Sequence, residues 1–277
     1  MTRRGFTLVE LLIAVIIAGI LGTALARLLV SDSRFAARQQ AMLSARSTAR
    51  AALNWMAEEL RAVSDGGLLD ASSDTVAVRA PYAFGTACDK AGGLMLLALV
   101  PTDSLLYSLA VPDGLAWRRS SGTYRFVSGV SVSMSTDSAT CAADSIRVIP
   151  DGQLVGVTGV PSGAPFQPVP GSIAYLYQTV SYKFAPSSDL PGRIGLWRKA
   201  GAAAYEELVA PFDTAAGFGF LVGSSFDALD DPPADLSTVS GLELRLVGAS
   251  DFVPRGADRA QTFELVTQIR FANTANY

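Results

Sequence analysis

The carboxylate of Glu10 lies where an acid is hardest to keep charged. It follows the residues FTLV and precedes sixteen residues without a charge, from Leu11 to Ala26. An unpaired carboxylate in a membrane helix costs roughly 2.5 to 3.5 kcal/mol at mid-depth and less near an end. A positive partner is therefore expected. The N-terminal end of the helix dipole supplies about half a charge, and a free amino group at Phe6 would supply a whole one.

The remaining side chains offer little for catalysis. The chain has no histidine, which removes the commonest general base and metal ligand and every Ser/His/Asp or Cys/His arrangement. Its formal charge of −3 and isoelectric point near 5.1 provide no positive field to gather nucleic acid. We expect no enzyme activity, no cofactor and no nucleic-acid partner. A carboxylate-only glycosidase stays open as the enzymatic alternative.

Two other clusters have chemical potential. Arg118 and Arg119 beside Trp117 could stack on the bases of DNA, although one basic pair is a small footprint in an acidic chain. Four aspartates within nine residues could offer oxygen ligands to calcium: Asp227, Asp230, Asp231 and Asp235. Their spacing matches no EF-hand, so we favour a solvated acidic turn and predict no metal site.

The segment around Glu10 is long enough to span a membrane. Phe6 to Ala26 is 21 residues with one charge, or about 30 Å of helix, the thickness of a hydrocarbon core. Arg3 and Arg4 precede it, so the positive-inside rule predicts a cytoplasmic N-terminus and an extracytoplasmic remainder. A cleaved secretory signal is the alternative. The apolar run is longer than such signals need, and Glu10 interrupts its start.

The stretch GFTLVE resembles the type III leader of type IV pilins and pseudopilins. Such a leader is short and basic, ends in glycine, and is followed by phenylalanine and by glutamate as the fifth mature residue. The resemblance implies cleavage by prepilin peptidase between Gly5 and Phe6, N-methylation of Phe6, and Glu10 as the assembly carboxylate. A neighbouring subunit's amine within 4 Å of Glu10 would be attracted by about 4 kcal/mol at an effective dielectric near 20. Snorkelling of Glu10 to the membrane interface is the alternative.

Small residues recur along one face of the same helix. They allow close backbone approach and predict a packing seam against other filament helices: Ala14, Ala18, Gly22 and Ala26. The frequency of alanine and glycine in membrane helices is an equally good explanation. No proline interrupts this segment, although pilin relatives often have one here, so no kink is expected.

The helix should continue beyond the membrane. Residues 31–64 are polar and free of proline, so a helix from Phe6 to Val63 would be about 87 Å long. An apolar stripe predicts packing on the protein's own head, with a coiled coil as the alternative: Met42, Ala49, Leu53, Met56, Leu60 and Val63.

Residues 65–277 have mainly the pattern of antiparallel strands, so the predicted fold class is α+β, a helical spine packed on a β-sheet head. The expected strands are Thr75–Arg79, Leu94–Val100, Val130–Met134, Ile146–Ile149, Ile173–Phe184, Ile194–Arg198, Phe218–Val222, Leu242–Val247 and Phe263–Phe271. Gly152 to Gly171, with four prolines, is expected to be a loop. The predicted divisions are a leader (1–5), a membrane helix (6–30), its amphipathic continuation (31–64) and one head domain (65–277).

Cys88 and Cys141 are the only cysteines, and they form no CxxC motif. One disulfide or two separate buried thiols are possible. The predicted extracytoplasmic location favours the disulfide, which would close about 50 residues and stabilise the head by roughly 4 kcal/mol.

The C-terminal half resembles the J-type minor pseudopilin of type II secretion and the W-type minor pilins. The resemblance rests on TVSYKF, GLWRK, EELVAPF, GFGFLV, GLELRLV and TFELVTQIRFAN, in that order. It implies a structural subunit at or near the tip of a filament, with other subunits, an inner-membrane assembly platform and membrane lipid as partners. An adhesin, a DNA-uptake tip protein or a membrane-anchored enzyme are the alternatives.

Overall fold

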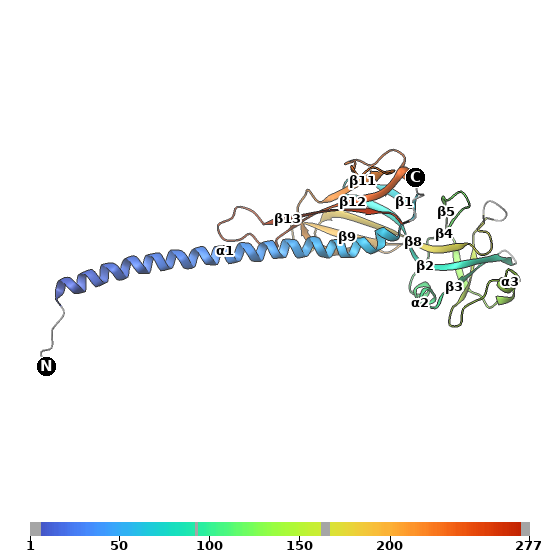
Figure 1. Cartoon of the computed structure of the whole chain (residues 1–277), viewed down its shortest axis with the longest axis horizontal. Helices are drawn as coiled ribbons and strands as arrows, with labels where there is room; N and C mark the ends of the chain where they lie inside the picture. Colours follow the sequence, from blue (N-terminus) through green and yellow to red (C-terminus); the bar gives the residue numbers. More distant parts are fainter. Residues whose placement is uncertain (1–6, 92–93, 162–166, 273–277) are drawn as a thin grey trace.

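The computed structural model describes residues 7–91, 94–161 and 167–272. Its dominant element is α1 (Leu8–Ala62), a 55-residue helix. At 1.5 Å per residue it is about 82 Å long. The N-terminal half of α1 projects alone, and the C-terminal half lies along the β-sheet (Figure 1). This confirms the predicted spine.

The rest of the chain is a β-rich head. Short helices α2 (Pro101–Leu109), α3 (Ser138–Ala143) and η1 (Leu236–Thr238) accompany the strands. The strands are β1 (Leu68–Ala71), β2 (Thr75–Ala91), β3 (Leu94–Leu99), β4 (Gly114–Arg118), β5 (Tyr124–Ser128), β6 (Ser131–Met134), β7 (Leu154–Thr158), β8 (Ile173–Pro186), β9 (Ile194–Ala200), β10 (Glu206–Phe212), β11 (Gly217–Val222), β12 (Val239–Ala249) and β13 (Thr262–Arg270).

These strands form one sheet in the order β11-β12-β10-β9-β8-β2-β3-β7-β6, with β1, β4, β5 and β13 joined at its sides. The pairings between the named strands are antiparallel, which confirms the α+β prediction. Strands β2 and β8 are 17 and 14 residues long and pair over most of their length. They connect two lobes of the head (Figure 1).

We call the two parts the proximal lobe, made of β1 and β9–β13 beside α1, and the distal lobe, made of β3–β7, α2 and α3. The proximal core contains Met56 and Leu60 of α1 together with Tyr182, Phe184 and Phe218 of the sheet. The distal lobe has a separate core, which includes Leu97, Leu115, Trp117, Val155 and Leu176. The distal lobe lies beyond the C-terminal end of α1 (Figure 1).

The buried face of α1 differs from the predicted stripe. Met42 and Leu53 are only partly buried. The fully enclosed residues of this face are mostly alanines: Ala41, Ala45, Thr48, Ala49, Ala52, Met56 and Leu60. The reason is a close approach of helix and sheet. A Cβ atom added at Gly248 of β12 would overlap the carbonyl oxygen of Ala45 and lie 3.1 Å from the Ala49 nitrogen.

Two predictions for the head are wrong. Ile146–Ile149 forms no strand. Ile146 and Val148 instead pack beside the two cysteines. The predicted loop from Gly152 to Gly171 contains β7, which pairs with β3 and β6. The prolines at 161, 168 and 170 follow β7 and therefore do not interrupt it, while Pro165 lies outside the described residues.

Replacement of Gly248 by alanine tests the close contact between helix and sheet. The added methyl group would meet backbone atoms of α1, which cannot move aside as a side chain can. Overpacking of this kind costs about 1–3 kcal/mol. We expect a lower midpoint in thermal unfolding of the full chain in detergent, followed by near-UV circular dichroism. Gly156→Ala in β7 is the matched control, because its nearest neighbour would be the Leu94 side chain at 3.4 Å. Equal midpoints for the two variants would contradict the explanation.

Candidate functional site

Glu10 belongs to a capping box at the start of α1. The Glu10 amide donates to the Thr7 hydroxyl oxygen at 3.3 Å, and the Thr7 amide donates to Glu10 Oε2 at 3.0 Å. The Thr7 hydroxyl donates to the same carboxylate oxygen at 3.0 Å. The carboxylate is therefore turned back toward the N-terminus. Thr7 was not among the predicted site residues, although the Thr-x-x-Glu spacing is the sequence signal for this role.

The cleavage and methylation positions Gly5 and Phe6 lie outside the described residues. Their roles therefore stay predictions, as does the assembly role of Glu10. Thr7, whose backbone amide binds the Glu10 carboxylate, directly follows Phe6 in the chain. The capping box thus holds the carboxylate one residue away from the position where cleavage would create an amino group.

The N-terminal part of α1 contacts none of the head. It contains a window apolar and long enough to cross a membrane, and no residue of that window is buried. The predicted seam residues Ala14, Ala18, Gly22 and Ala26 are all exposed along it. Space is open around Gly22, since a Cβ added there would meet no atom within 4 Å. The packing role of this seam stays a prediction.

A polar cluster fixes the other end of α1 to the sheet. The guanidinium of Arg198 on β9 forms an ion pair with both oxygens of the Glu59 carboxylate, with Nε 3.2 Å from Oε2. The hydroxyl of Tyr182 on β8 also donates to Glu59 Oε2. Burial and the nearby Glu59 carboxylate raise the pKa of Tyr182, so its phenol stays a donor. No local sequence pattern predicts this cluster, because Glu59 is 123 residues from Tyr182 and 139 residues from Arg198.

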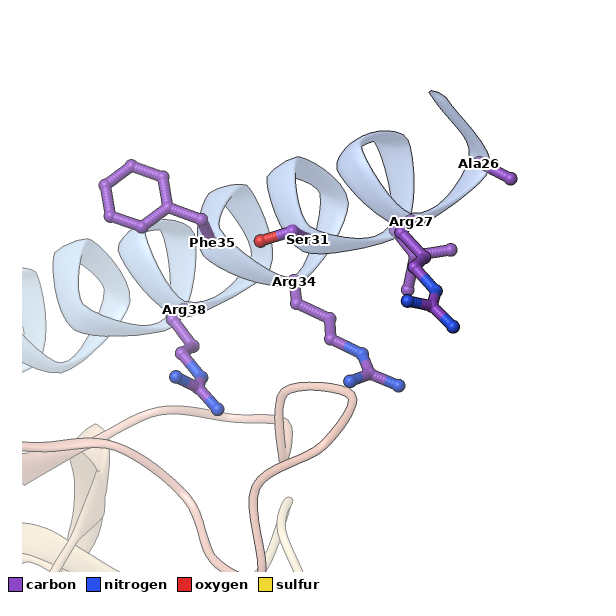
Figure 2. A pocket seen from close by; sticks show the side chains of 7 residues that line it. Ala26, Arg27, Ser31, Arg34, Phe35 and Arg38 are labelled. Carbon is purple, nitrogen blue, oxygen red and sulfur yellow. The ribbon is translucent and has the colours of Figure 1, made fainter. Parts of the chain in front are cut away.

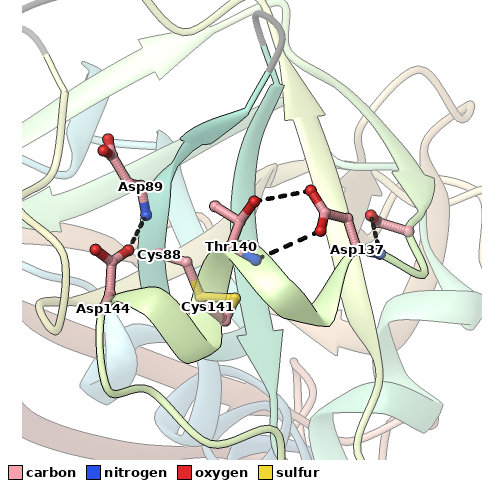
Figure 3. The surroundings of a disulfide bond; sticks show 7 residues. Cys88, Asp89, Asp137, Thr140, Cys141 and Asp144 are labelled. Atoms are coloured by element: carbon pink, nitrogen blue, oxygen red, sulfur yellow. Dashed lines mark hydrogen bonds between the residues drawn. A yellow bond between two sulfur atoms is a disulfide. The ribbon is translucent and has the colours of Figure 1, made fainter.

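The structure joins Cys88 of β2 to Cys141 of α3 in a disulfide, which confirms the predicted pair. Both residues are buried. Figure 3 shows that Asp144 accepts a hydrogen bond from the Asp89 amide at 2.7 Å, and that Asp137 binds the Thr140 hydroxyl at 2.8 Å. The disulfide and the Asp144 contact attach α3 to the far end of β2, and Asp137 caps the start of α3.

The acidic turn makes internal contacts. Asp230 forms an ion pair with Arg245 at 2.6 Å, and Asp235 accepts hydrogen bonds from Ser237 at the start of η1. Asp227 and Asp231 are exposed. Within residues 7–91, 94–161 and 167–272, no three His, Cys, Asp or Glu side chains gather as a set of metal ligands.

Trp117, Arg118 and Arg119 do not form one exposed surface on which bases could stack. Trp117 is 3% exposed and belongs to the distal core. The Arg118 side chain donates to the Gly122 carbonyl at 3.0 Å, in the turn between β4 and β5. The alternative of DNA stacking on Trp117 is therefore wrong.

A groove between α1 and the distal lobe contains several carboxylates. It is lined by Trp55, Glu58 and Glu59 of α1 and by Tyr82 and Asp103, among others. Glu59 is bound by Arg198 and Tyr182. Burial raises the pKa of Asp103, and a hydrogen bond from the Phe84 backbone opposes that shift. Glu59 and Asp103 thus both have partners within the fold.

Arg198→Met tests the clamp between α1 and the sheet. It would leave Glu59 partly buried without its cation. The side chains are 27% and 29% exposed, so screening by water limits the expected loss to about 1–2 kcal/mol. Thermal unfolding in detergent of Arg198→Met, Glu59→Gln and the double variant gives the coupling between the two residues. Arg50→Met, on an exposed position of α1, should stay near wild type. A coupling energy of zero between Arg198 and Glu59 would contradict the conclusion that this pair clamps α1 to the sheet.

Comparison with known proteins gives one match. Residues 1–26 match the family described as the prokaryotic N-terminal methylation motif. No curated protein and no solved structure matches the chain. The match covers the predicted leader, Glu10 and the small-residue face of α1. Residues 1–26 thus carry the motif of a type IV prepilin leader, which supports a place for this chain in the pilin and pseudopilin superfamily.

Proposed function

We propose that this chain is a minor pilin or pseudopilin, a structural subunit that is processed and then assembled into a filament. Prepilin peptidase cleaves between Gly5 and Phe6, and Phe6 is N-methylated. The mature chain is stored as a single-pass inner-membrane protein with its N-terminus in the cytoplasm and its head outside. The assembly platform then moves it into a type II secretion pseudopilus or a type IV pilus.

The observation that carries this proposal is the geometry of Glu10 within the prepilin motif. Its carboxylate is an exposed acid at the start of an apolar helix, and Thr7 turns it toward the N-terminus. In lipid such a charge needs a counter-charge. The Phe6 amine of an adjoining subunit would supply one, so pairing of Glu10 would bring an incoming subunit into register.

The shape of the head supports a position at or near the tip. The distal lobe continues beyond the end of α1 (Figure 1). If the helices of a filament are nearly parallel to its axis, this lobe occupies space along the axis that a following subunit would need. The stretches that resemble J-type and W-type subunits form β8 to β13 in the same order, which is consistent with that assignment.

Processing can be tested by intact-mass analysis of the protein from hosts with and without prepilin peptidase. We expect the loss of MTRRG and the gain of one methyl group only when the peptidase is present. The physical reason for the motif is the new amine beside Glu10, so cleavage must fall before Phe6. An unprocessed chain in both hosts, or a cut beyond Ala26, would exclude the proposed function.

Substitution of Glu10 separates its charge from its capping role. Glu10→Gln keeps a side chain that can complete the capping box but removes the charge. Glu10→Leu removes both. If charge pairing drives assembly, both variants insert into membranes normally and co-purify with the major subunit at least about tenfold less, since a loss of 1.4 kcal/mol already gives tenfold.

The control is Glu58→Gln, which removes an exposed acid from the same helix and should assemble normally. Normal assembly of Glu10→Gln with failure of Glu10→Leu would assign Glu10 to helix capping alone.

A further inference from the structure

Three arginines form a stripe on α1 directly after the apolar segment. Arg27, Arg34 and Arg38, with Ser31 between them, have spacings of four, three and four residues, so they lie on one face of the helix. Figure 2 shows the three side chains on the same side of α1. They line an open cleft of about 620 Å³ whose other lining residues also belong to α1. The same face continues into the buried alanines that dock on the sheet.

The loop between β12 and β13 lies opposite this stripe. Arg38 donates a hydrogen bond to the Gly256 carbonyl at 3.3 Å. Gly256 has a positive φ of +81°, and a Cβ added there would lie 3.6 Å from Arg34 Nε. Figure 2 shows Arg34 and Arg38 extending toward this loop. The head therefore reaches along α1 as far as the arginine stripe. The loop that makes this contact is at the end of the head nearest to the membrane-spanning segment (Figure 1).

The three guanidinium groups of the stripe form no ion pair in the part of the chain that the structure describes. Among the described residues, no carboxylate lies within 4 Å of a guanidinium nitrogen of Arg27, Arg34 or Arg38. The loop adds Arg255 and Arg259. The two segments together contain these five arginines and three aspartates, Asp32, Asp251 and Asp258, so they have an excess of two positive charges in a chain of net charge −3.

The position of the stripe corresponds to the polar layer of a bilayer. The last residue of the uncharged run is Ala26. Arg27 follows at once, and Arg34 lies seven residues, or about 10 Å, further along the axis. Helical side chains extend toward the N-terminus. The Arg34 guanidinium, which points that way in Figure 2, therefore reaches back toward the headgroups, whereas Arg27 already begins at their level. Arginine side chains of this length reach headgroups by snorkelling, and the polar layer is about 5–8 Å deep.

Membrane orientation does not explain these arginines. The positive-inside preference disfavours basic residues on the translocated side, where the proposed function places Arg27 and Arg34. An anion supplied from outside the chain would compensate them. Exposed Val30 and Phe35 line the same cleft, which suits a ligand that is apolar on one side and anionic on the other.

We propose that Arg27 and Arg34 bind the headgroup phosphate of an anionic phospholipid such as phosphatidylglycerol, in the leaflet next to the head. The inference rests on the proposed function, since it requires α1 to span the membrane. Arg38 is held by the loop and keeps the head over the bound lipid. The site orients the stored subunit, with its head close to the membrane surface, before assembly.

The test places the full chain in nanodiscs of equal parts phosphatidylglycerol and phosphatidylcholine, and native mass spectrometry then counts the lipids retained after partial delipidation. We expect phosphatidylglycerol to be enriched over phosphatidylcholine. Each basic residue at an anionic surface raises the binding constant for that surface about fivefold. The double variant Arg27→Gln/Arg34→Gln should therefore lower the enrichment of phosphatidylglycerol about tenfold or more. Arg50→Gln with Arg61→Gln, two exposed arginines farther along α1, should leave it unchanged.

Several outcomes would overturn the inference. They are equal enrichment in the two double variants, loss of enrichment on adding inorganic phosphate, and loss of filament partners rather than of lipid in Arg27→Gln/Arg34→Gln. The second outcome would indicate a free-anion site, and the third an acidic surface on a neighbouring subunit. Absence of enrichment with normal processing leaves the proposed function standing. Failure of the wild-type chain to enter nanodiscs would overturn both.

Discussion

The close packing of α1 on strand β12 is the contact on which the rest of the structure depends. It requires alanines on the helix and a glycine on the strand, because a single Cβ at Gly248 would overlap the backbone at Ala45. The contact places the sheet alongside the helix, so the head has one fixed orientation relative to the apolar stem. Glu59 and Arg198 then hold the far end of the same helix.

The two parts of α1 are suited to different environments. Its N-terminal part is apolar on all sides and suits lipid, whereas its C-terminal part has one buried face and several exposed polar ones. The charges lie near the ends of the lipid-facing part: Glu10 at its start, and Arg27 and Arg34 just after it. Burial of such charges in hydrocarbon is costly, so the two proposals give each of them a partner outside the chain.

Local patterns predicted the parts of the structure that depend on local sequence. The length of α1 followed from the absence of proline between Ser31 and Val63, and β8 corresponds to the predicted strand Ile173–Phe184. The prediction for the face of α1 that packs on the sheet was partly wrong, because it was based mainly on the spacing of large apolar residues. Here the alanines are buried, and Met42 lies at the edge.

Long-range contacts account for the remaining differences. Strand β7 is short, and its pairing with β3 and β6 stabilises it in a segment where proline and glycine suggested a loop. The capping box at Thr7 follows from the local sequence, since Thr-x-x-Glu is a recognised spacing, so Glu10 combines a capping role with its charge. Glu59 and Arg198 are 139 residues apart, and no local pattern brings such residues together.

The two lobes achieve their stability differently, and this bears on how the head can work. The proximal lobe is covered by α1 along much of its length, so its core is closed by a helix that is itself anchored in the stem. The distal lobe extends past the end of α1, and its described residues form only the short helices α2 and α3 beside the strands. A covalent link between α3 and β2 compensates for the missing helix by restricting the unfolded chain over a separation of 53 residues. The lobe is thus attached to the rest of the head chiefly through β2 and β8, and it can present a surface away from the apolar part of α1 without disturbing the packing between α1 and the sheet.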